Sequence, residues 1–176
     1  ETVVLYGKPL TIGSLYLLDS DTSHIAATVI SPDTQRPDTG SCFVYAYQEP
    51  PLNRLVGLTL TGGTGTYWTS IAEFAGGAIY VLRTRVEVLS CRILSSTAFD
   101  GGGVSVIGHF GQNDASARII NTQIRNCSST AWGGGVYAVN CALTVRNSVF
   151  EDNISQSQSG GGLTAISSYS ELDSCL

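Results

Sequence analysis

The sequence has little charge, no methionine and no long apolar run. Lys, Arg, Asp and Glu together make up 13% of the 176 residues, too few to cover the wet faces of an amphipathic helical bundle. Lys and Arg form no cluster and the net charge is −5, so the basic face that a nucleic-acid partner requires is missing. No apolar run approaches the roughly 18 residues of a membrane span. We therefore expect no nucleic-acid partner and no membrane span in this segment.

The residues that are abundant favour β-structure. Hydrophobic residues make up 43% of the chain, enough for a continuous core, and 20 glycines accompany them. The polar side chains are mainly those of Ser, Thr and Asn, which favour turns and strands over helix interiors. The composition therefore predicts one all-β domain over residues 1–176.

The clearest signal is an internal repeat of a glycine-rich corner that leads into a strand. Its first copy is Gly76-Gly77-Ala78-Ile79. The later copies are Gly101-Gly102-Gly103-Val104, Gly133-Gly134-Gly135-Val136 and Gly160-Gly161-Gly162-Leu163. Successive copies are separated by 25, 32 and 27 residues, and the longest spacing contains an insertion at 109–114. Without it the period is about 26 residues, as in a solenoid whose insertions lie outside the stacked strands.

Superposing the repeats aligns side chains of the same kind. The predicted inward columns are Ile79, Val104, Val136 and Leu163; Val81, Val106, Ala138 and Ala165; Val88, Ile119, Val145 and Leu172; and Ile93, Ile124 and Phe150. One coil is too thin to bury such side chains, but coils stacked at about 4.8 Å share one core. We therefore predict a right-handed, single-stranded parallel β-helix of about five or six coils, either a segment of a longer solenoid or an assembling subunit.

The first third of the chain is less regular. Residues 2–12 and 25–30 are expected to form strands of an early coil, and 31–40 a surface loop. Residues 61–74 are expected to form a long Gly- and Thr-rich excursion.

Small polar residues align at one turn between strands. They are Ser90, Asn121, Asn147 and Ser174. Stacked there, their side chains can hydrogen-bond along the axis and satisfy the bent backbone. The alternative is that they are four solvated turn residues.

Two motifs carry a resemblance to a known group. Gly76-Gly77-Ala78-Ile79 and Phe150-Glu151-Asp152-Asn153 resemble the GGA(I/L/V) and FxxN motifs of polymorphic outer-membrane proteins, which are bacterial surface adhesins and autotransporters with a pectin-lyase-like β-helix. Gly7-Lys8-Pro9-Leu10-Thr11-Ile12 and Asp21-Thr22-Ser23-His24-Ile25, followed by Thr28-Val29-Ile30, are similar to segments of secreted bacterial β-helix repeat proteins. The resemblance implies an extracellular or cell-surface protein.

The five cysteines are predicted to be small buried residues that fill the core. They are Cys42, Cys91, Cys127, Cys141 and Cys175. No two of them align on adjacent coils, so no disulfide is predicted. No closely spaced pair is present either, so no metal site is expected.

Catalytic residues and cofactors are not expected. Asn121-Thr122-Gln123 and Gly108-His109-Phe110 stand where a polysaccharide hydrolase would need aspartate and histidine motifs, and neither supplies paired carboxylates. Glu87, Asp100, Glu151 and Asp152 fall on different columns. His24 and His109 are expected to be solvated.

Carbohydrate contact is predicted for four aromatic residues. Tyr80 and Tyr137 share an outward column, while Trp68 and Trp132 lie at corners where loops emerge. Exposed rings can stack on sugars; the alternative is that these rings only cover the core or strand edges.

Two N-x-S/T sequons predict N-glycan acceptors at Asn126 and Asn153. By column, Asn126 is expected to face outward and Asn153 inward.

Three functions are compatible with these patterns. A structural or adhesive surface protein comes first, with open solenoid ends that stack on like subunits or further coils of the same protein into a fibre or stalk. The alternative is a carbohydrate-binding β-helix module, and the sequons make a glycoprotein the expectation in either case. A polysaccharide lyase or hydrolase is the third, and catalysis is not expected.

Overall fold

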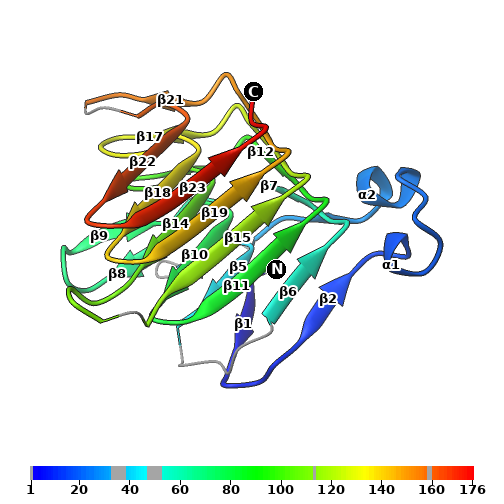
Figure 1. The fold of residues 1–176 in the computed structure, drawn as a ribbon, viewed down its shortest axis with the longest axis horizontal. Helices are drawn as coiled ribbons and strands as arrows, with labels where there is room; N and C mark the ends of the chain where they lie inside the picture. Colours follow the sequence, from blue (N-terminus) through cyan, green and yellow to red (C-terminus); the bar gives the residue numbers. More distant parts are fainter. Residues whose placement is uncertain (1, 33–38, 47–52, 113, 158–159) are drawn as a thin grey trace.

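The computed structural model describes residues 2–32, 39–46, 53–112, 114–157 and 160–176. Its strands stack into a parallel β-helix that runs from the blue N-terminal strands to the red C-terminal strands (Figure 1). Each coil contributes one strand to each of several parallel sheets, so that residues far apart in the sequence become neighbours along the axis. This confirms the predicted fold class.

Two six-stranded parallel sheets form the long walls of the stack. The strands of the first sheet, in spatial order, are β1 (Val3–Leu5), β5 (Phe43–Tyr45), β10 (Ile79–Leu82), β14 (Val104–Ile107), β18 (Val136–Val139) and β22 (Leu163–Ile166). Those of the second sheet are β2 (Thr11–Gly13), β6 (Asn53–Val56), β11 (Arg85–Leu89), β15 (Ser116–Ile120), β19 (Ala142–Arg146) and β23 (Tyr169–Asp173). Six strands in each sheet correspond to six coils.

Two further parallel sheets close the cross-section. The third sheet consists of β3 (Val29–Ile30), β7 (Thr59–Thr61), β12 (Arg92–Leu94), β16 (Gln123–Arg125) and β20 (Val149–Glu151). The fourth consists of β13 (Thr97–Ala98), β17 (Ser128–Ser129) and β21 (Ile154–Ser155). A regular coil therefore has four strands separated by corners.

The strand register confirms the predicted columns. Ile79 pairs with Val104, Val104 with Val136 and Val136 with Leu163 in the first sheet. In the second sheet the register joins Val88 to Ile119, Ile119 to Val145 and Val145 to Leu172. In the third sheet Ile93, Ile124 and Phe150 follow one another.

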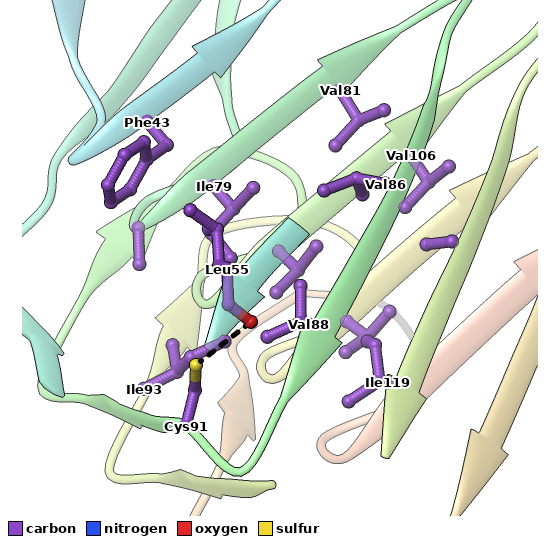
Figure 2. Packing of buried hydrophobic residues seen from close by; sticks show 14 of the residues in the cluster. Phe43, Leu55, Ile79, Val81, Val86, Val88, Cys91, Ile93, Val106 and Ile119 are labelled. Carbon is purple, nitrogen blue, oxygen red and sulfur yellow. Dashed lines mark hydrogen bonds between the residues drawn. The ribbon is translucent and has the colours of Figure 1, made fainter. Parts of the chain in front are cut away.

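The aligned aliphatic side chains form one continuous core. Ile79, Val88, Ile93 and Ile119 are each 0% exposed, and Figure 2 shows them pointing from different sheets toward one axis. Because each coil covers the next, burial comes from neighbours along the axis rather than from within a coil.

Left-handed backbone conformations turn the chain at the corners. The first glycine of each repeated corner, Gly76, Gly101, Gly133 or Gly160, has a φ between 59° and 86°. A Cβ at Gly101 would lie 2.3 Å from the carbonyl oxygen of Val104. This corner therefore requires glycine both for its φ and for the close approach of the backbone.

Two short helices replace part of the predicted early coil. Residues 25–27, expected in a strand, belong to α2 (Ser23–Ala27), and α1 (Tyr16–Asp19) precedes it. The predicted strand 2–12 is likewise two strands, β1 and β2, with a break between them. Both helices lie outside the stack of strands (Figure 1). The prediction failed here because residues 14–27 leave the repeat between β2 and β3, so coil periodicity does not apply to them.

The excursion predicted at 61–74 contains two strands. β8 (Gly65–Trp68) and β9 (Glu73–Ala75) pair antiparallel, and β4 (Thr39–Gly40) pairs antiparallel with β8. Ala75 also forms a parallel bridge with Asp100. This antiparallel sheet covers part of the outward side of the first sheet, where Trp68 packs against the cluster that contains Tyr80.

We predict that Gly101→Ala destabilises the protein more than Gly111→Ala does. Both glycines have positive φ, 64° and 74°, but nothing lies within 4 Å of a Cβ at Gly111. The left-handed conformation costs each variant about 1–2 kcal/mol, and overpacking at Gly101 adds about 1–3 kcal/mol. Urea unfolding of both variants measures the difference. Equal losses in the free energy of unfolding would contradict this account of the corner.

Candidate functional site

The predicted polar turn residues occupy a left-handed corner. Ser90, Asn121, Asn147 and Ser174 have φ values of 52°, 52°, 50° and 52°. The backbone N–H groups of the first three donate to the next coil: Ser90 to Ile120 O, Asn121 to Arg146 O and Asn147 to Asp173 O. No hydrogen bond joins the side chains of successive members within the described part of the chain, so the predicted side-chain ladder at these positions is wrong. Asn and Ser are there because short polar side chains tolerate the left-handed conformation.

Hydrogen bonds between side chains and the next coil are formed instead by the residue after each left-handed one, whose side chain turns inward. The N–H of Cys91 donates to Thr122 Oγ1 at 3.3 Å, and the N–H of Thr122 donates to Ser148 Oγ at 3.1 Å. In return, the hydroxyl of Thr122 contacts Ile120 O at 3.0 Å and Val88 O at 3.4 Å. One small hydroxyl therefore joins two coils and satisfies the bent backbone.

Two other corners repeat the arrangement. The N–H of Cys127 donates to Asn153 Oδ1 at 3.0 Å, and Asn153 Nδ2 donates to Ile124 O at 2.8 Å. The N–H of Cys141 donates to Ser168 Oγ at 3.3 Å. Corners that follow strands of the first, second and third sheets are thus tied to the next coil by a side-chain oxygen.

Four of the five cysteines, Cys91, Cys127, Cys141 and Cys175, directly follow the left-handed residue of such a corner, whereas Cys42 directly precedes β5. Cys91 Sγ donates to Leu55 O of the preceding coil at 3.6 Å (Figure 2), as Cys127 Sγ does to Ile93 O at 3.8 Å. All five are free thiols, and burial raises the pKa of Cys42 to about 12 and of Cys91 and Cys127 to about 11. The prediction of buried cysteines is confirmed for Cys42, Cys91, Cys127 and Cys141, whereas Cys175 in the last coil is half-buried.

The four aromatic residues predicted to contact glycans are not all on the surface. Tyr80 and Tyr137 face outward from the first sheet, yet they are only 3% and 6% exposed. The expectation that they present open rings is wrong. Tyr80 is covered by the antiparallel sheet, where the half-buried Trp68 packs against its cluster. Trp132 is half-buried as well. Glycan contact by Trp68 and Trp132 stays a prediction.

A buried carboxyl lies close to these rings. Asp100 is 3% exposed, and its Oδ1 accepts the backbone N–H of Trp132 at 3.1 Å. Burial raises the pKa of Asp100 to about 6, the Trp132 N–H opposes the shift, and the charge of Glu73 adds to it. Burial is the main cause that raises the pKa of Tyr137 to about 12, and the charge of Asp100 adds to the shift. Sequence analysis placed Asp100 on a column of its own but did not predict its burial, because that burial involves β9, which bridges to Asp100 through Ala75.

The other acidic side chains are engaged elsewhere. Glu87 lies between Arg54 Nε at 2.7 Å and Arg118 Nη1 at 2.6 Å across the second sheet. Glu151 pairs with Arg125 at 2.8 Å on the third sheet. The prediction that Glu87, Asp100, Glu151 and Asp152 lie apart is thus consistent with the structure. Both histidines pair with aspartates near loops, His24 with Asp19 and His109 with Asp114.

The two sequons differ in accessibility. Asn126 is exposed at a left-handed corner with a φ of 53°. Asn153 is half-buried, and its amide is engaged with Cys127 and Ile124. This matches the predicted orientations, and Asn126 is the accessible one; glycosylation itself stays a prediction.

Two clefts lie where a loop overhangs a corner of the stack. One, of about 340 Å³, lies between the loop that carries His109 and Phe110 and the corner at Asn140 and Ser167. The other, of about 330 Å³, lies between the α1–α2 segment and the corner at Ser90 and Asn121. Sequence analysis missed the second cleft because it did not predict the helices.

The last coil leaves inward-facing side chains uncovered. Leu172 is 56% exposed, whereas Val145 and Ile119 in the same column are 0% exposed. Ala165 is exposed, whereas Ala138 in the preceding coil is fully buried. Among the described residues no strand pairs with the outer edges of β22 and β23, and these edges present backbone donors and acceptors.

Within the described residues, no group of three or more His, Cys, Asp or Glu side chains is placed to hold a metal ion. No described helix has the length and apolarity needed to cross a membrane. Comparison with protein-family models, curated proteins and solved structures found no match to this chain.

We predict that Asp100→Asn increases the free energy of unfolding, relative to the unsubstituted chain, by more at pH 8 than at pH 4. A carboxyl whose folded pKa of about 6 exceeds its unfolded value of 3.8 binds protons more tightly in the folded state. Its contribution to stability is therefore fully present at low pH and is lost as pH rises from about 4 to 6. Asn keeps an acceptor for the Trp132 N–H without the charge.

The expected gain for Asp100→Asn, relative to the unsubstituted chain, is roughly 1–3 kcal/mol between the two pH values. Asp152→Asn removes the same charge from an exposed corner where Asn126 stands one coil earlier. Thermal and urea unfolding at both pH values measure the effect. A gain for Asp100→Asn that is independent of pH would contradict the assignment.

Proposed function

We propose that this chain is a structural or adhesive β-helix of an extracellular or cell-surface protein, and that its open coil stacks on another coil. The covering coil is either a second copy of the chain or a further part of the same protein. The observation that carries the proposal is the exposure of Leu172. This residue belongs to a column whose members Leu55, Val88, Ile119 and Val145 are completely buried.

The chemistry of this surface favours a coil as the partner. The exposed residues belong to inward columns that are apolar over several coils, and the strand edges present a row of backbone donors and acceptors. A second coil matches both features. It would bury the apolar column, and its strands would hydrogen-bond to the open strand edges at the usual strand spacing. Contact between different ends of two copies is heterologous, and such a contact generates a fibre when it does not close into a ring.

The surface location rests on the sequence. The glycine corners resemble those of bacterial surface adhesins, and the accessible Ser-, Thr- and Asn-rich corners carry few charges. Carbohydrate binding is the second candidate function, favoured by the polar cleft beside α1 and α2.

We predict that the chain self-associates as its concentration rises, and that Leu172→Glu weakens this association. A carboxylate in the apolar column would be buried unpaired in the contact, which costs several kcal/mol. Leu18→Glu is the matched control, because Leu18 is 83% exposed in α1 and lies outside the inward columns.

Sedimentation velocity over a range of concentrations measures the association, and circular dichroism checks that both variants are folded. The proposal predicts association of the parent chain and of Leu18→Glu but not of Leu172→Glu. A folded chain that stays monomeric at all concentrations, or equal association of the two variants, would count against stacking through this end.

A further inference from the structure

The cleft beside the helices is a formed feature with fixed walls. Its outer wall comes from the α1–α2 segment and its floor from the corners of the third and fourth coils. Tyr16 Oη donates to Ser90 Oγ at 3.3 Å, which fixes α1 to the corner. Thr59 Oγ1 donates to Ile25 O at 2.6 Å, which fixes α2 to the third sheet. Its volume, about 330 Å³, lies within the range of small-molecule sites.

The cleft holds a cation that has no partner among the residues that the structure describes. Arg92 lines it, and the side chain of Arg92 forms no hydrogen bond or ion pair with any residue that the structure describes. Five other arginines do form ion pairs: Arg54, Arg83, Arg118, Arg125 and Arg146. No Asp or Glu lines the cleft. The two nearby acids of the helical segment, Asp19 and Asp21, accept backbone N–H groups of Asp21 and Ser23.

Neutral polar groups surround this guanidinium. Gln123 follows Arg92 in register on the third sheet, and Asn121 follows Ser90 at the corner. The side chains of Thr22, Asn121 and Gln123 have no hydrogen-bond partners among the described residues, so their donors and acceptors are available. The ring of Tyr16 and the side chain of Ile25 add apolar surface on the opposite wall.

We propose that this cleft binds a small polyhydroxylated carboxylate, either a free sugar acid or the acidic terminal sugar of a glycan. The planar guanidinium of Arg92 pairs with the carboxylate. The sugar hydroxyls form hydrogen bonds with the side-chain amides and hydroxyls of Asn121, Gln123, Ser90 and Thr22. The apolar face of the sugar ring packs against Tyr16 and Ile25. The site lies on the side of the solenoid and does not depend on axial stacking.

Titration of the whole chain with four small molecules tests the ligand chemistry. The probes are glucuronate, methyl β-glucuronide, glucose and acetate, followed by ¹H–¹⁵N NMR shifts at constant ionic strength. Both acids are expected to shift amides at Ser90, Arg92 and Asn121, with glucose and acetate at least tenfold weaker. Binding of the free acid alone identifies a sugar acid as the source, and binding of both acids allows a glycan terminus. No shift with either acid, or acetate as strong as glucuronate, would overturn the proposal.

Three variants separate the site from general charge effects. Arg92→Gln places the residue of the next coil at this position, and Gln123→Val does the same with Val149, so both suit the fold. Arg118→Gln, on the second sheet, removes an equal charge outside the cleft. Affinity for glucuronate is expected to fall about tenfold or more in Arg92→Gln and severalfold in Gln123→Val, and to stay within about twofold in Arg118→Gln. Unchanged affinity in Arg92→Gln, or an equal loss in Arg118→Gln, would overturn the site.

Discussion

The whole stack depends on pairing the backbone where each coil turns a corner. A strand pairs with its neighbours along the axis, but a turning backbone would leave N–H groups buried and unpaired, which costs about 1–3 kcal/mol each. The protein places a left-handed residue at the corner and follows it with a small inward side chain. Thr122 illustrates the result: it accepts the N–H of Cys91 from one coil while its own N–H donates to Ser148 of the next.

This constraint explains why Ser, Thr, Asn and Cys exchange at equivalent positions. All four side chains are small, and each can donate to or accept from a nearby backbone group. The thiols of Cys91 and Cys127 reach carbonyl oxygens of the preceding coil as the hydroxyl of Thr122 does. It also explains where sequence can be inserted. Segments such as the α1–α2 helices and the β8–β9 strands leave the stack at a corner and return to the same register, so function can be added without changing the core.

The part of the fold that repeats could be predicted from sequence, because stacking requires like residues at like positions. The columns from Ile79 to Leu163 and from Val88 to Leu172 followed from spacing alone. What does not repeat was missed. The burial of Tyr80 and Asp100 depends on the antiparallel sheet, and the cleft at Arg92 depends on helices folded from residues 16–27. No periodic signal describes where such insertions pack. The corner ladder was placed one residue early, because spacing identifies the corner but not which residue turns inward.

Hydrogen exchange at the Cys91 amide tests the corner account most directly. The N–H of Cys91 has Thr122 Oγ1 as its side-chain partner, and Thr122→Val keeps the shape of the side chain while removing that oxygen. Thr97→Val, at an exposed position of β13, is the control. NMR-detected exchange should be at least about tenfold faster at Cys91 in Thr122→Val and unchanged in Thr97→Val. Exchange at Cys91 that is equally slow with and without the Thr122 hydroxyl would contradict the claim that inward corner side chains hold the coils together.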